Sequence, residues 1–162
     1  MKFTRAAPAS CRESALAMLA RRAHTRLELQ QKLRRKQFET DEIEAVLDRL
    51  AERGLVDDRK TASSIVRTQS ARGRGRGRLA SELSAKGVSR EDSAAALDEL
   101  DPAEEAANLA RVLARKARSL SASLTPQARS KKLFDHLVRR GYSPGAVLAA
   151  LRKKGEPADD EP

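Results

Sequence analysis

Leucine pairs four residues apart recur at three places in the chain. The pairs are Leu29 and Leu33, Leu79 and Leu83, and Leu133 and Leu137. Side chains four residues apart share one face of a helix, so each pair predicts an amphipathic helix with a buried side. Five residues after each pair stands Phe38, Val88 or Tyr142, and fourteen residues after it Leu47, Leu97 or Leu151. The chain therefore contains an internal repeat, with a period of 50 residues from Leu33 to Leu83 and of 54 from Leu83 to Leu137.

The residues that follow each leucine pair predict a turn. Gly87 and Gly141 stand just before the apolar residue, where a glycine can take the left-handed conformation that ends a helix. Gln37 holds this position in the first repeat, where a left-handed turn is less favoured. A residue with a hydroxyl that can cap exposed amides is expected to open the next helix: Thr40, Ser89 or Ser143.

Further capping signals place the other helices. A helix over about residues 13–23 is expected to precede the first pair, and a capping box from Thr25 to Glu28 starts the helix that bears that pair. Other expected starts are Asp57 or Asp58, Asp101-Pro102 and Thr125-Pro126, and expected ends are Gly54 and Gly155. Because no segment alternates as a half-buried strand does, the chain is predicted to be all-α, with three tandem three-helix repeats of helix-turn-helix type.

Three helices of this size bury little surface alone, because units near about 45 residues are marginally stable. We therefore expect the repeats to pack end to end in an elongated array that can curve. The predicted repeats span residues 13–56, 57–100 and 101–155, with an Arg/Gly-rich connection at 72–78 inside the second. Residues 1–12 and the acidic tail 156–162 lack periodicity and are predicted to be disordered.

The overall composition narrows the class of partner. The formal net charge is +10, and such a surplus favours a polyanion such as nucleic acid or a nucleoprotein. Aromatic residues are 2% of the chain, which argues against RNA-recognition and oligonucleotide-barrel modules, since these stack bases on aromatic rings. With Cys11 as the single cysteine and no apolar run of membrane-spanning length, we predict a soluble, cytoplasmic monomer.

Basic residues in each repeat are candidate contacts with such a polyanionic partner. In the run from Arg72 to Arg78, alternating glycines are expected to keep the segment flexible while guanidinium groups bind phosphate or carboxylate. The alternative is a solvated linker, and long basic side chains on a helix often do no more than keep its surface wet. The candidate set is Arg21, Arg22, Arg26, Arg34, Arg35, Lys36, Arg67, Arg72, Arg74, Arg76, Arg78, Lys86, Arg129, Lys131, Lys132, Arg139 and Arg140.

No group of residues has the spacing of a catalytic or metal site. Asp57 and Asp58 are adjacent at a helix start, where carboxylates usually act as caps. His24 and His136 are isolated in sequence, and Cys11 lies in what is expected to be a frayed start. The Arg-Gly run lacks the lysine and serine of a phosphate-binding loop. We therefore predict that the protein is not an enzyme and needs no cofactor.

Four motifs follow one another along the chain. They are Leu27-Glu-Leu29-x-x-x-Leu33 with Phe38; Gly54-Leu-Val-Asp57-Asp58; Gly75-Arg-Gly77-Arg-Leu79-x-x-Glu82-Leu83-x-x-Lys86-Gly87-Val88; and Lys132-Leu133-x-x-x-Leu137-x-x-Arg140-Gly141-Tyr142-Ser143. Their order and spacing, from about Ser14 to Gly155, resemble the RecX family of regulators of the bacterial recombinase RecA. The helices after Asp58 and at Pro102 lack aromatic residues that the family often carries there, so contacts made by those rings are not implied.

The resemblance implies a protein that binds RecA and RecA–single-stranded DNA filaments in the filament groove and restrains ATP hydrolysis, strand exchange and co-protease activity. One alternative is a nonspecific helix-turn-helix-type DNA-binding protein, since the charge also suits weak DNA binding. Acidic residues at the expected recognition helices, among them Asp41, Glu42, Glu91 and Asp92, argue against sequence-specific reading. A second alternative is a helical adaptor that binds protein alone.

Overall fold

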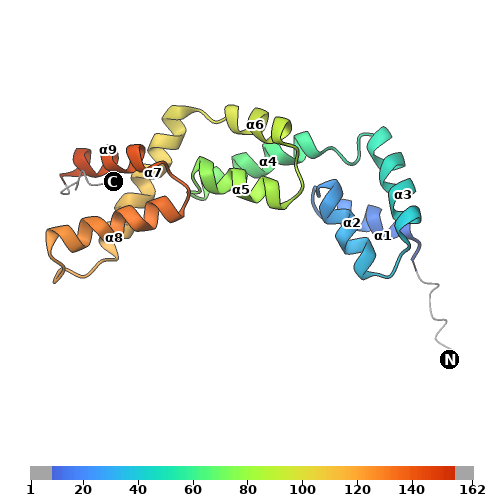
Figure 1. Ribbon diagram of the computed structural model, residues 1–162, viewed down its shortest axis with the longest axis horizontal. Coiled ribbons are helices and arrows are strands. Elements are labelled where there is room, and N and C mark those ends of the chain that lie inside the picture. The colour runs from blue at the N-terminus through green and yellow to red at the C-terminus, as the bar shows by residue number, and fades with distance from the viewer. Residues whose placement is uncertain (1–8, 156–162) are drawn as a thin grey trace, which may run out of the picture. The chain divides into compact units, whose positions relative to one another are not determined.

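The all-α prediction is confirmed. The computed structural model describes residues 9–155, and over this range the chain forms nine helices and no strand (Figure 1). The predicted disorder of the tail 156–162 and of residues 1–8 lies outside the described residues. The helices are α1 (Cys11–Leu19), α2 (Arg26–Arg35), α3 (Thr40–Glu52), α4 (Asp58–Ala71), α5 (Arg76–Ala85), α6 (Arg90–Asp98), α7 (Pro102–Arg118), α8 (Pro126–Arg139) and α9 (Pro144–Lys154).

The chain divides into two compact units. Unit 1 comprises the residues up to Thr61 together with Lys86–Val88, and unit 2 comprises Ala62–Ala85 and the residues from Ser89 onward. Unit 1 therefore holds α1 to α3 and the start of α4, while unit 2 holds the rest of α4 and the whole of α5 to α9. The elongated form expected of the repeat array stays a prediction.

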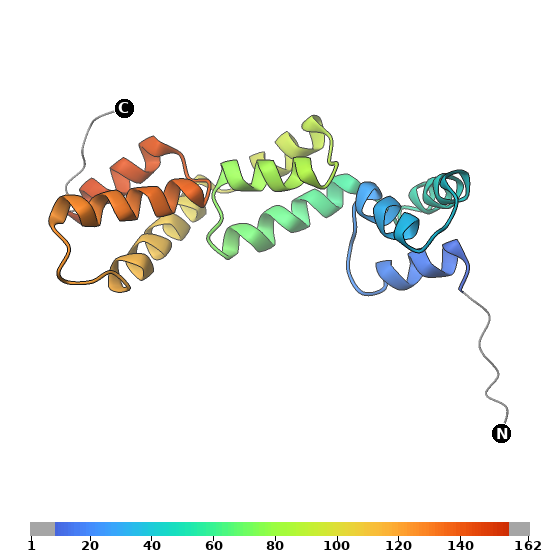
Figure 2. The ribbon, with the colours of Figure 1, turned by 60° about the horizontal axis from the view of Figure 1, so that its bottom comes forward.

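The leucine pairs lie in the cores of these units. In unit 1, Leu29 and Leu33 of α2 are fully buried against Ile43 and Leu47 of α3 and Ala15 of α1. In unit 2, Leu79 and Leu83 of α5 are also fully buried. The third pair packs in a core formed by α7, α8 and α9. These three helices lie next to one another in both ribbon views (Figure 2). This core contains Leu109, Val112, Leu113, Ala117, Leu133, Leu137, Tyr142, Val147 and Leu151.

The first helix begins and ends earlier than the predicted range 13–23. Ser10 accepts a hydrogen bond from the Glu13 amide at 3.2 Å, and the Glu13 carboxylate accepts from the Ser10 amide at 2.8 Å. This capping box starts the helix at Cys11, so Cys11 and Arg12 belong to α1 and not to a disordered segment. The expectation that Cys11 lies in a frayed start is therefore wrong: its side chain is fully buried in the core of unit 1, and burial, followed by the charge of Glu42, raises the pKa of its thiol.

Most of the predicted caps are present. Thr25 and Glu28 form the expected capping box at α2, and Ser89 and Ser143 accept amide hydrogen bonds at the starts of α6 and α9. Thr40 is an exception, because α3 already includes it and the capping position falls on Glu39, whose side chain makes no capping hydrogen bond. Asp57 caps α4 by accepting from the Lys60 amide at 2.9 Å, as expected of a carboxylate at a helix start.

Gln37 takes the left-handed conformation although it carries a side chain. Its φ is +67°, close to the +74° of Gly87 at the equivalent turn of the second repeat. It is the one non-glycine residue with positive φ among the described residues. Its side chain is exposed, so no neighbouring element excludes it, and what remains is the backbone cost of a left-handed residue that carries a Cβ.

Replacing Gln37 with glycine is therefore expected to raise the free energy of unfolding by about 1 kcal/mol, because it removes the left-handed strain. Gly54→Ala is the converse control, since Gly54 has a φ of +67° and open space around its Cα. That substitution should lower the free energy of unfolding by about 1 kcal/mol. Urea unfolding followed by circular dichroism measures both changes, and a Gln37→Gly protein less stable than the parent would contradict the strain.

Candidate interaction surface

The Arg-Gly run from Arg72 to Arg78 is an ordered junction within unit 2 and not a flexible connection. Its last three residues belong to α5, which begins at Arg76. The amide of Gly75 donates to the Arg140 carbonyl at 2.8 Å, and the amide of Gly77 donates to the Gly141 carbonyl at 2.9 Å. The start of α5 is thus hydrogen-bonded to the turn between α8 and α9, and the two lie side by side in both ribbon views (Figures 1 and 2).

The alternating glycines permit this close approach. A Cβ on Gly75 would lie 2.5 Å from both the Gly141 carbonyl carbon and the Tyr142 nitrogen, and a Cβ on Gly141 would lie 2.2 Å from the Arg78 nitrogen. Contacts that short require a shift of backbone, which these two segments cannot make without breaking their hydrogen bonds. The glycines therefore serve packing and not flexibility, which corrects the prediction made from their alternation with arginine.

Several arginines of the run are engaged inside unit 2. Arg74 pairs with Glu82 of α5, and Arg76 pairs with Asp98 and donates to the Leu97 carbonyl at 3.0 Å. From the other side of the junction, the Arg140 guanidinium donates to the carbonyls of Gly73 at 3.0 Å and Arg72 at 3.2 Å. Arg140 thus stabilises the junction itself, while Arg74 and Arg76 link the run to α5 and α6.

Unit 1 contains an equivalent contact one repeat earlier. Thr25, at the position of Gly75, donates its hydroxyl to the Lys86 carbonyl at 2.7 Å, and Lys86 pairs with Glu28. A Cβ on Gly87 would lie 2.7 Å from the Leu27 side chain, so this glycine also sits in a close contact. The segment before the leucine pair of one repeat thus binds the glycine turn of the next at both places where the sequence repeats.

Glu28 is the charged centre of the unit 1 contact. Burial raises the pKa of this carboxyl, but hydrogen bonds from Lys86, Arg22 and the Thr25 amide outweigh burial and lower it to about 2. The Glu28 side chain is 15% exposed, and the Arg22 pairing distance is 3.2 Å. A carboxylate held ionised in this way stabilises the folded state at neutral pH.

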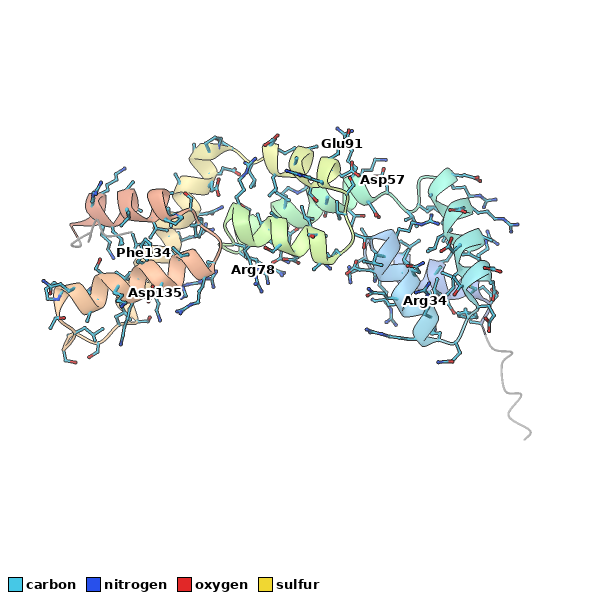
Figure 3. The ribbon with its side chains drawn as sticks, in the orientation of Figure 1. Arg34, Asp57, Arg78, Glu91, Phe134 and Asp135 are labelled. Carbon is cyan, nitrogen blue, oxygen red and sulfur yellow. The ribbon has the colours of Figure 1, made fainter. Side chains whose placement is uncertain are left out.

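The predicted contact residues divide by their surroundings. Seven make hydrogen bonds or ion pairs within the chain: Arg22, Arg26, Arg74, Arg76, Lys86, Arg129 and Arg140. The others are exposed and form no ion pair with any residue of the range 9–155: Arg21, Arg34, Arg35, Lys36, Arg67, Arg72, Arg78, Lys131, Lys132 and Arg139. Arg34 on α2 and Arg78 on α5 are labelled in Figure 3. The structure thus separates the candidate cations that pair within the chain from those that do not, and contact of either group with a partner stays a prediction.

Two residues interpreted as isolated in sequence have definite environments. His24 is 3% exposed, its Nδ1 donates to the Arg22 carbonyl at 2.9 Å, and its Nε2 accepts from Lys32 at 2.8 Å. Burial, more than the neighbouring charges, lowers the pKa of His24. His136 is half-buried on α8, and burial followed by Arg140 and other cations lowers its pKa too. Through these two hydrogen bonds His24 stabilises the turn before α2.

Across residues 9–155, no three His, Cys, Asp or Glu side chains gather in a way that could hold a metal ion. Within the same residues, no helix is both long enough and apolar enough to cross a membrane.

Family models match the chain in three successive places. They describe the first three-helix domain of RecX at residues 11–50, the second at 57–97 and the third at 103–151. Among curated proteins, the regulatory protein RecX of Halorhodospira halophila is 37% identical over 157 residues, covering 96% of this chain and 94% of that protein. The regulatory protein RecX of Thermobifida fusca is 39% identical over 149 residues, covering 91% of this chain and 80% of that protein.

Solved structures show the same fold. A crystal structure of a regulatory protein RecX superposes with a TM-score of 0.81 at 23% identity, covering 88% of this chain and 71% of that chain. The crystal structure of RecX from Lactobacillus salivarius gives 0.72 at 24% identity, covering 88% and 93%. The prediction of tandem three-helix repeats is thus confirmed by both sequence and structure.

Because Gly141 lies so close to Arg78, adding a single methyl group at Gly141 is expected to destabilise the fold strongly. Gly141→Ala places a Cβ against the Arg78 backbone at a φ of +92°, and we expect it to lower the free energy of unfolding by about 3 kcal/mol. Gly145→Ala, four residues later in α9, adds its Cβ to open space and should raise stability by about 1 kcal/mol through helix propensity. Denaturant unfolding measures the free energy of unfolding of both variants. Equal changes in Gly141→Ala and Gly145→Ala would contradict the close approach of Gly141 to Arg78.

The low pKa of Glu28 predicts a pH-dependent contribution to stability. Because the folded pKa of about 2 lies below the ordinary value of 4.5, the stabilisation is present above pH 4.5 and is lost as the pH falls towards 2. Glu28→Gln should therefore be less stable than the parent at pH 7, with a smaller difference at pH 3. Glu52→Gln, at an exposed position of α3, is the control. A Glu28→Gln deficit that stayed constant from pH 7 to 3 would contradict the assignment.

Proposed function

The chain belongs to the RecX family of regulatory proteins, and we propose that it binds RecA and RecA–single-stranded DNA filaments, lies in the filament groove, and inhibits RecA's ATP hydrolysis, strand exchange and co-protease activity. The observation that carries this proposal is the set of exposed cations without internal carboxylate partners among residues 9–155, which occurs in each of the three repeats. A filament of protein on DNA presents both carboxylates and phosphates to such cations.

The repeat architecture supports binding to a repeating partner. Separate modules joined in one chain can each make a weak contact, and the second and third contacts then form at a high effective concentration. Affinity therefore comes from several modest surfaces and does not need one deep site. A filament offers identical subunits in sequence, which matches a chain of three similar units.

Sequence-specific DNA reading is a weaker explanation. The helices that would enter a major groove begin with acidic side chains, Asp41 and Glu42 in α3 and Glu91 and Asp92 in α6. The corresponding helix of the third repeat, α9, begins with Pro144-Gly-Ala, which offers no side chain that reads a base edge. Weak, nonspecific DNA binding by the exposed cations remains the second proposal, and a protein adaptor the third.

Arg72 and Arg78 provide the sharpest test of the cationic surface, because they flank the junction without an ion pair to any residue in the described range. Replacing both with serine should weaken binding to RecA–single-stranded DNA filaments about tenfold at moderate salt and reduce the slope of log affinity against log salt by about 1 to 2. The cause is the loss of two charge-assisted contacts, and fluorescence anisotropy over a salt titration measures it.

The matched control is Arg115→Ser with Arg118→Ser, which removes the same charge from exposed positions of α7 outside the candidate set. This control should lose less than half as much affinity. Equal losses in both variants would show that net charge alone governs binding, and no loss in either would remove the Arg-Gly junction from the interface.

A further inference from the structure

A groove on unit 2 runs beside the junction described above. It is lined by residues of α5, α6, α7, α8 and α9 and has a volume of about 1090 Å³. Its apolar lining includes Leu97, Pro102, Leu109 and Val138, with the smaller side chains of Ala106 and Ala149 leaving it open. Phosphate groups gain nothing from contact with an apolar surface of this kind. Burying it against the apolar side chains of a partner is favourable.

Charges on the groove lining are mostly positive. Arg78, Arg139 and Lys153 line it, and none of them is ion-paired to another residue in the range 9–155. Arg76 also lines it but is paired with Asp98. The one carboxylate of the lining is Glu105, which accepts from the Arg76 amide at 3.4 Å. An occupant with carboxylates beside its apolar side chains therefore meets complementary charge.

Tyr142 provides a second observation: one of its polar groups in the groove wall does not contribute to the stability of the isolated chain. It lines the groove and is 3% exposed, yet its hydroxyl has no hydrogen-bond partner among the residues that the structure describes. A buried hydroxyl without a hydrogen-bond partner destabilises the folded state. Phenylalanine would fill the same space without this cost, so stability alone does not account for the hydroxyl.

We infer that this groove binds a segment of a protein partner whose apolar side chains are flanked by aspartate or glutamate. The inference rests on the proposed function, since the partner that presents the segment is then RecA within its filament. DNA is the weaker occupant, because the lining between the cations is apolar and would leave phosphates without donors. The cationic residues outside the groove, such as Arg34 and Lys131, stay available for the nucleic acid.

Ala106→Glu tests the inference, because it places a bulky negative group at an exposed position of the groove without altering a buried residue. Ala110→Glu is the matched control: it makes the same change on the same helix at an exposed position outside the groove lining. We expect Ala106→Glu to weaken binding to RecA–single-stranded DNA filaments at least tenfold, and Ala110→Glu to weaken it less than twofold. Both variants should bind bare single-stranded DNA alike and unfold at the same temperature.

The remaining outcomes separate the alternatives. If the unaltered protein does not bind the filament, both the proposed function and this inference are refuted. If it binds and both variants bind as tightly, only the groove is refuted as the binding site. Equal weakening of DNA binding and filament binding by Ala106→Glu would make DNA the occupant. The acidic tail 156–162 is tested by ending the chain at Gly155: if that raises filament affinity tenfold in the parent and not in Ala106→Glu, the tail is the occupant and the inference is overturned.

Discussion

Two backbone hydrogen bonds, from Gly75 to Arg140 and from Gly77 to Gly141, join the middle helices to the third three-helix group. They bring the two backbones so close that a Cβ on Gly75 or on Gly141 would clash with the opposite segment, and glycine at both positions makes that approach possible. The guanidinium of Arg140 then reaches across to carbonyls of the Arg-Gly run. Beside this contact, Arg74 and Arg76 pair with carboxylates of unit 2, while Arg72 and Arg78 form no ion pair with any residue in the range 9–155.

The same contact explains how a basic segment can have both structural and binding roles. Arg74 and Arg76 contribute to the fold through these ion pairs, while the unpaired Arg72 and Arg78 beside them are open to a partner. The groove begins at this point, since Arg76, Gly77 and Arg78 belong to its lining. The packing of the repeats and the proposed recognition of a partner therefore share one set of residues.

Much of the fold follows from the sequence because its causes are local. Leucine spacing, capping residues and glycine stops act within a few residues of one another, and they placed the helices to within about two to four residues. The junction depends on a contact across more than sixty residues, so alternation of Arg and Gly was interpreted as flexibility. The expectation for Cys11 is wrong for the same reason, since burial depends on neighbours in space. Lys153 and the alanines that line the groove belong to no sequence motif, so the sequence pattern could not identify them as part of a binding site.

The central claim is that this basic helical repeat protein acts on the RecA filament and does not merely coat DNA. RecA's single-strand-dependent ATP hydrolysis measures this most directly, with the protein added at amounts well below those that saturate the same DNA in a binding assay. The account predicts clear inhibition at these substoichiometric amounts. Inhibition that begins only where the protein covers the free DNA, or no inhibition at any amount, would contradict it.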